Sequence, residues 1–115
     1  MKKSVAASLN RVELLTLVAA HRLGDDEAYG VTIQREIASL NGREISMGAV
    51  YAALERLERL GLVRPRLSEP RSERGGRARR IFTVTTAGLE SIRLARAEAM
   101  RLWSAVSIPK GGRRS

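Results

Sequence analysis

The chain has 115 residues, enough for one domain with a single core, and its 43% hydrophobic and 29% charged residues are typical of a globular protein. Its 21 Lys and Arg residues exceed its 12 Asp and Glu residues, and the net charge of +9 favours a polyanionic partner such as DNA or RNA. The absence of cysteine and the single histidine exclude disulfides, thiolate chemistry and nearly every zinc site.

Two further classes of protein are disfavoured by the sequence. No cluster of acid, base and nucleophile indicates an enzyme, and no cofactor is expected. No apolar run approaches the roughly 18 residues that a membrane span needs, and the stretch MKKSVAASLN lacks the apolar core of a signal peptide. We therefore expect a cytoplasmic protein with no membrane partner.

The first half of the chain predicts two helices. Apolar residues recur at helical spacing over residues 9–24, where Ser8 or Asn10 is suited to cap the start and Gly24 to close the end. After the turn DDEA, a shorter helix is predicted from about Gly30 to Leu40.

Residues 46–60, SMGAVYAALERLERL, form the clearest predicted helix, with Ser46 as a suitable N-cap. The outer side of its first half carries small residues and one tyrosine, which would allow close approach to base edges in a major groove. The DNA-contact candidates here are Ser46, Met47, Gly48, Tyr51 and Ala52. The alternative is an ordinary amphipathic helix, although solvated faces favour Lys, Glu and Arg over small residues. Glu55 and Glu58 lie further along the helix, where we expect them to be clear of the DNA major groove and able to pair with Arg59 or Arg56.

Two short strands are predicted next, at residues 62–67 and 79–85, and Pro65 confines the first to an edge or to a position whose N–H is not needed. A shorter or irregular ribbon is expected around this proline. The loop between the strands contains SERGGRARR, whose arginines suit phosphate and whose glycines allow close approach. The candidates for DNA contact in this wing are Arg74, Gly75, Gly76, Arg77 and Arg79. The alternative is a solubilising charged loop.

A long final helix is predicted from Thr85 or Thr86 to about Val106. So long a helix exceeds what the rest of a small domain covers, and a twofold partner would cover it. The predicted dimer-interface residues are Leu89, Ile92, Ala99 and Trp103. The competing interpretation folds this helix back onto the first one, and Trp103 is also a candidate for lining a ligand crevice.

The order helix, helix, helix, strand, strand, helix predicts a mainly α fold with a two-stranded β-wing, that is, a winged helix-turn-helix with a long C-terminal helix. We expect a flexible N-terminus at residues 1–8, the DNA-binding domain at 9–86, the dimerisation helix at 87–106 and a basic flexible tail at 107–115.

Several of these stretches together resemble the PadR-like transcriptional regulators, over roughly residues 9–103. The shared elements are Tyr29-Gly30, GAVY followed by LERLE, GLV at 61–63, the GGR of the wing, and Thr85, Ala87 and Gly88. The resemblance implies a homodimeric bacterial repressor of the short subtype that binds a pseudo-palindromic operator in double-stranded DNA.

The resemblance also implies roles for individual residues. Ser46, Gly48 and Tyr51 match recognition-helix positions, and Gly75, Gly76, Arg77 and Arg79 match the wing. Tyr29 matches the family tyrosine before the second helix and is a candidate contact to the DNA backbone. Some members of the family sense a small hydrophobic effector between aromatic side chains, and this chain is only 3% aromatic. The alternatives are an RNA-binding winged helix, which would need aromatic stacking platforms, and a protein-interaction module.

Overall fold

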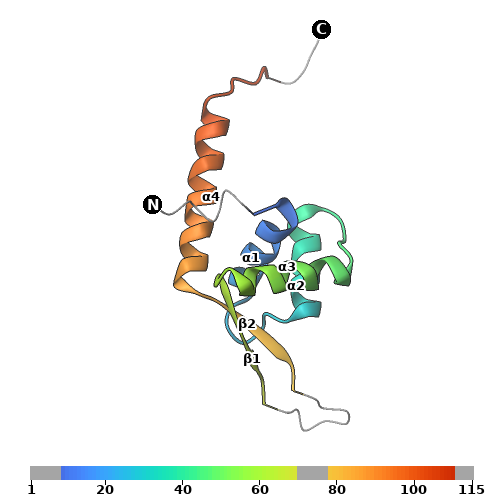
Figure 1. Cartoon of the computed structure of the whole chain (residues 1–115). Helices are drawn as coiled ribbons and strands as arrows, with labels where there is room; N and C mark the ends of the chain where they lie inside the picture. Colours follow the sequence, from blue (N-terminus) through green and yellow to red (C-terminus); the bar gives the residue numbers. More distant parts are fainter. Residues whose placement is uncertain (1–8, 70–77, 111–115) are drawn as a thin grey trace.

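The computed structural model describes residues 9–69 and 78–110 (Figure 1). The chain runs through six elements: α1 (Arg11–Leu23), α2 (Gly30–Asn41), α3 (Met47–Arg59), β1 (Val63–Leu67), β2 (Arg80–Val84) and α4 (Thr86–Ser104). Three short helices pack together, an antiparallel two-stranded hairpin follows them, and a longer helix stands at one side of the body. This architecture confirms the predicted mainly α fold with a two-stranded wing.

The helices begin where polar side chains can satisfy their free N–H groups. At α1 the Asn10 side chain accepts a hydrogen bond from the Glu13 backbone N–H at 2.8 Å, and Glu13 accepts one from the Asn10 N–H at 2.9 Å. Ser46 caps α3 by accepting from the Ala49 N–H at 3.1 Å. Thr85 caps α4 in the same way, through the Gly88 N–H at 3.0 Å.

The final helix ends slightly earlier than the sequence pattern indicates. It stops at Ser104, before the expected limit at Val106. The Ala105 N–H donates to the Leu102 carbonyl at 3.2 Å and the Val106 N–H to the Trp103 carbonyl at 3.1 Å. These tighter turns continue the apolar pattern for two residues beyond the α-helix, which explains the difference.

The hairpin is regular through its proline. Pro65 of β1 lies opposite Phe82 of β2, within a continuous register from Val63 opposite Val84 to Leu67 opposite Arg80. The Phe82 N–H points away from β1, because it donates to the Ala28 carbonyl at 2.8 Å. The Pro65–Phe82 pair is therefore a non-hydrogen-bonded pair, in which a missing N–H costs nothing. The expectation of an irregular ribbon around Pro65 is therefore wrong, because the proline occupies a position whose N–H is not needed.

The Phe82–Ala28 hydrogen bond also joins the start of α2 to the hairpin. Next to it, Tyr29 forms an isolated antiparallel bridge with Ile81. The residues before α2 thus lie along the outer edge of β2, joined to it by this single bridge and the Phe82–Ala28 hydrogen bond. This attachment holds the N-terminus of α2 close to Ile81 and Phe82 of β2.

One core lies between the first three helices and the base of the hairpin. Its largest fully buried side chains are Leu17, Ile33, Ile37, Val50, Leu54, Leu57 and Leu62, together with Thr16. Glu13 is also buried, at 8% exposure, and pairs with Arg56 at 3.1 Å. This ion pair connects α1 to the side of α3 that does not carry Tyr51, so the two helices are held by both apolar and charged contacts.

Helix α4 joins this body through a glycine at its start. A Cβ on Gly88 would overlap the Leu62 carbonyl oxygen and would lie 2.7 Å from Val84 Cγ1. Both neighbours belong to the packed base of the hairpin, and one is backbone, so neither can move cheaply. Gly88 therefore sets how closely α4 approaches the hairpin.

Replacing Gly88 by Ala should lower the free energy of unfolding by about 1–3 kcal/mol, because the new methyl group displaces α4 from the hairpin. Gly48→Ala is the matched control, since a Cβ there would meet only Ser46 Oγ, at 3.9 Å. The control should be neutral or should stabilise by up to about 1 kcal/mol through helix propensity. Urea denaturation of both variants measures the difference, and equal effects would contradict the close approach at Gly88.

Candidate nucleic-acid interface

The first half of α3 presents small side chains to solvent. Ser46, Gly48 and Ala52 are exposed, and Met47 is half-buried. The other side of the helix is inserted in the core through Val50 and the leucines that follow it. The structure therefore brings the five candidates of this helix to one exposed end, where another molecule can approach the backbone closely.

Tyr51 is half-exposed and its ring lies against the start of α2. A Cβ on Gly30 would overlap the Tyr51 hydroxyl oxygen and lie 2.7 Å from its Cζ. Because Gly30 has no side chain, the phenol fits over the first turn of α2. A residue with a side chain at position 30 would therefore clash with the ring of Tyr51.

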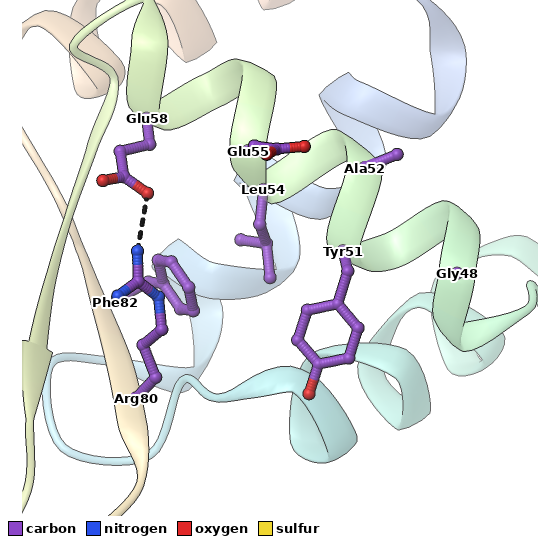
Figure 2. Close-up of a pocket in the computed structure, with 8 residues that line it drawn as sticks. All are labelled: Gly48, Tyr51, Ala52, Leu54, Glu55, Glu58, Arg80 and Phe82. Atoms are coloured by element: carbon purple, nitrogen blue, oxygen red, sulfur yellow. Dashed lines mark hydrogen bonds and ion pairs between the residues drawn. The ribbon is translucent and has the colours of Figure 1, made fainter.

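A groove of about 460 Å³ separates α3 from β2 (Figure 2). It is lined by Gly48, Tyr51, Ala52, Leu54, Glu55, Glu58, Arg80 and Phe82. Glu58 and Arg80 face each other across it, with Arg80 Nη2 2.9 Å from Glu58 Oε1. The guanidinium of Arg80 also lies 5.5 Å from the centre of the Phe82 ring. This ion pair joins α3 to the hairpin across the groove.

The structure corrects one expectation about the acidic residues of α3, the partner of Glu58. Glu58 pairs with Arg80, from the hairpin, and not with Arg59 or Arg56 of its own helix. Glu55 lines the same cavity of the protein as Gly48 and Ala52, and its position relative to the major groove of bound DNA stays a prediction. Intrahelical spacing made the nearer arginines the expected partners, but the folded hairpin brings a competing arginine closer to Glu58.

A second groove, of about 400 Å³, opens at the start of α2. It is lined by Tyr29, Gly30, Val31, Arg35, Tyr51, Arg79 and Arg80. The guanidinium of Arg79 stacks over the Tyr29 ring, 4.2 Å from its centre, a cation–π geometry. Two predicted contact residues from different parts of the chain, Tyr29 and Arg79, are thus side by side.

Arg35 is a candidate that the sequence pattern did not single out. It lies on α2, and only the bridge between Tyr29 and β2 brings it to the same groove as Arg79. Among residues 9–69 and 78–110, neither arginine has an ion-pair partner. Two uncompensated guanidinium groups and two tyrosines around one open groove suit a phosphate group.

The remaining candidates of the wing, Arg74, Gly75, Gly76 and Arg77, lie outside the described residues. The candidates on α4 are placed differently from one another. Leu89, Ala99 and Trp103 are exposed, and Trp103 is 62% exposed and lines neither groove. Ile92 is half-buried and packs against the core of its own chain.

The described part of the chain contains no group of three or more His, Cys, Asp or Glu side chains placed to hold a metal ion. No helix within it has the length and apolar character to cross a membrane.

Three packed helices, the third with an exposed face of small residues, followed at once by a β-hairpin, define a winged helix-turn-helix protein. The family model described as "Transcriptional regulator PadR-like family" matches residues 20–94, more than half of the chain. The chain belongs to this family, which confirms the resemblance seen in the sequence.

Individual relatives agree with this assignment. The Mycobacterium tuberculosis transcriptional regulator Rv3488 is 40% identical over 68 residues, a match that covers 59% of this chain and 59% of that protein. The chain thus matches less than two thirds of the length of this relative.

Solved structures show the same fold. A PadR family transcription regulator from Clostridium difficile R20291 superposes with a TM-score of 0.70 at 20% identity, covering 84% of this chain and 94% of that one. RosR of H. salinarum superposes with a TM-score of 0.66 at 20% identity, covering 89% and 84%. At these identities the likeness establishes the fold.

Replacing Gly30 by Ala should displace the Tyr51 ring from the start of α2. Because the neighbour is the end of a rotatable side chain, the cost in unfolding free energy should be only about 1 kcal/mol. The ring-proton NMR signals of Tyr51, assigned with Tyr51→Phe, should shift in Gly30→Ala and stay close to their original positions in Gly48→Ala. Unchanged Tyr51 signals in Gly30→Ala would contradict this packing.

Proposed function

We propose that the chain is a homodimeric, sequence-specific DNA-binding repressor that acts in the bacterial cytoplasm. The observation that carries the proposal is the exposed small-residue end of α3, which lies near Arg35 and Arg79, two arginines with no ion-pair partner among the described residues. Family membership supports it, and so does the net charge of +9.

In this proposal, residues of the two grooves make different kinds of contact with duplex DNA. The end of α3, with Ser46, Gly48 and Tyr51, would enter the major groove, where base edges carry a distinct pattern of donors and acceptors. Arg35, Arg79 and Tyr29 would contact the adjacent phosphates, which position the protein but carry no direct sequence information. In this proposal the remaining wing candidates, Arg74, Gly75, Gly76 and Arg77, contact the backbone or the minor groove.

The dimer is proposed from the exposure of α4. Of its 19 residues only Gly88 and Ser91 are buried, and Met100, Leu102 and Trp103 are each more than half exposed. In Figure 1 the C-terminal half of α4 extends away from the three-helix body. A second copy of the chain would bury this apolar surface and place two recognition helices on one operator. A small hydrophobic effector that contacts Trp103 and changes the spacing of the two α3 helices would release the DNA.

Binding to duplex DNA should weaken steeply with salt. If each subunit neutralises about four phosphates, log affinity should fall against log salt with a slope of about −7 for the dimer. Arg35→Ala should reduce the slope by about 2 for the dimer, since one contact is lost in each subunit. Fluorescence anisotropy with a labelled random-sequence duplex measures both slopes.

The matched control for Arg35→Ala is Arg11→Ala, which removes the same charge where Arg11 donates to Asn41, at the opposite end of α2. It should leave the slope unchanged. A nearly flat salt response of the wild type would contradict the proposal. Tighter binding of single-stranded RNA in the same assay would favour the RNA-binding alternative.

The dimer is tested by placing charges on α4. The wild type should have the mass of two 12.6 kDa chains in size-exclusion chromatography with light scattering, and the double variant Met100→Glu/Trp103→Glu should have the mass of one. Arg101→Glu, on the side of the helix opposite the mean direction of Met100, Leu102 and Trp103, should remain dimeric. A double variant that stays dimeric and helical would show that α4 is not the interface.

A further inference from the structure

The groove between α3 and β2 contains two carboxylates with different electrostatic surroundings. Glu58 is neutralised by Arg80, whose Nη2 lies 2.9 Å from its Oε1. Glu55 is exposed, and in the part of the chain that the structure describes its side chain has neither a hydrogen bond nor an ion pair. Among the described residues, the carboxylate of Glu55 in this groove therefore has no charged partner.

Glu55 lies on the same face of α3 as Gly48 and Ala52, the small residues near the start of this helix. Positions 48, 51, 52 and 55 follow the spacing i, i+3, i+4, i+7 that aligns side chains along one side of a helix, and all four line the groove. The recognition helix of homeodomains contacts DNA through four positions with this same spacing. Glu55 is thus on the side of α3 that the proposed function directs to the major groove.

A carboxylate in that position discriminates between DNA sequences by its charge. It repels phosphates and the acceptor atoms N7 and O6 of guanine, and it is favoured where a base amino group donates to it. Adenine offers an amino group next to its acceptor N7, whereas cytosine offers its N4 amino group without an adjacent acceptor. Cytosine is therefore the base that best matches an unpaired glutamate.

We infer that Glu55 is a specificity-determining residue that accepts a hydrogen bond from the N4 amino group of a cytosine in each operator half-site. The same charge lowers affinity for duplexes that present no amino group there. This inference rests on the proposed function, because it requires that α3 enters the major groove of duplex DNA.

The test is selection of bound sites from random duplex DNA with three proteins: wild type, Glu55→Gln and Glu98→Gln. The wild type should select a twofold-symmetric motif with one strongly preferred C·G pair in each half-site. Glu55→Gln should lose at least about fivefold of that preference at this position only, which corresponds to the lower end of one base contact. Glu98→Gln removes the same charge on α4 and should return the wild-type motif.

A second variant separates the hydrogen bond from the charge. Glu55→Asp keeps the negative charge but shortens the side chain, so it should relax the preference without raising affinity for a duplex that lacks the motif. Glu55→Gln should raise that non-specific affinity, measured by anisotropy at constant salt. Because Glu55 is exposed, both variants should match the wild type in urea denaturation.

The outcomes distinguish this inference from the proposed function. A wild-type motif that Glu55→Gln selects unchanged would overturn the role of Glu55 and leave the DNA-binding proposal intact. Failure of the wild type to select any motif would overturn sequence-specific binding and, with it, the role of Glu55.

Discussion

The arrangement of the candidate interface depends on one short attachment between distant parts of the chain. The Phe82 N–H donates to the Ala28 carbonyl at 2.8 Å, and Tyr29 bridges to Ile81 beside it. These two contacts, on the outer edge of β2, hold the start of α2 against the hairpin. Because the attachment exists, Arg79 stacks on Tyr29 and shares a groove with Arg35.

Two close approaches made possible by glycines complete the arrangement. Gly30 receives the Tyr51 ring and so couples α3 to the start of α2. Gly88 allows α4 to contact the carbonyl of Leu62 and the side chain of Val84. One glycine shapes the surface proposed to meet DNA, and the other fixes the direction in which α4 leaves the body. The surface proposed for DNA and the surface proposed for a second subunit are thus both positioned by contacts with the hairpin or with the segment that pairs with it.

Sequence patterns predicted the local features well, because short-range chemistry determines them. Asn10, Ser46 and Thr85 are caps within three residues of the N–H groups that they accept from, and helical periodicity placed Val50 and Leu54 in the core. The partner of Glu58 was predicted wrongly, since spacing within a helix favours Arg59 or Arg56 and carries no information on a hairpin arginine. Arg35 was not predicted as a site residue, because spacing within α2 carries no information on the hairpin residues that share its groove.

The sequence by itself therefore determined the element types, their order, the exposed small-residue face of α3 and the family, because caps, periodicity and turn residues act over a few positions. The tertiary structure alone decided which charges are neutralised and which remain free. Arg80 pairs with Glu58, while within residues 9–69 and 78–110 Glu55, Arg35 and Arg79 have no ion-pair partner around the grooves. Such pairing depends on contacts between residues more than twenty positions apart, which only the packing of the hairpin against the helices can create.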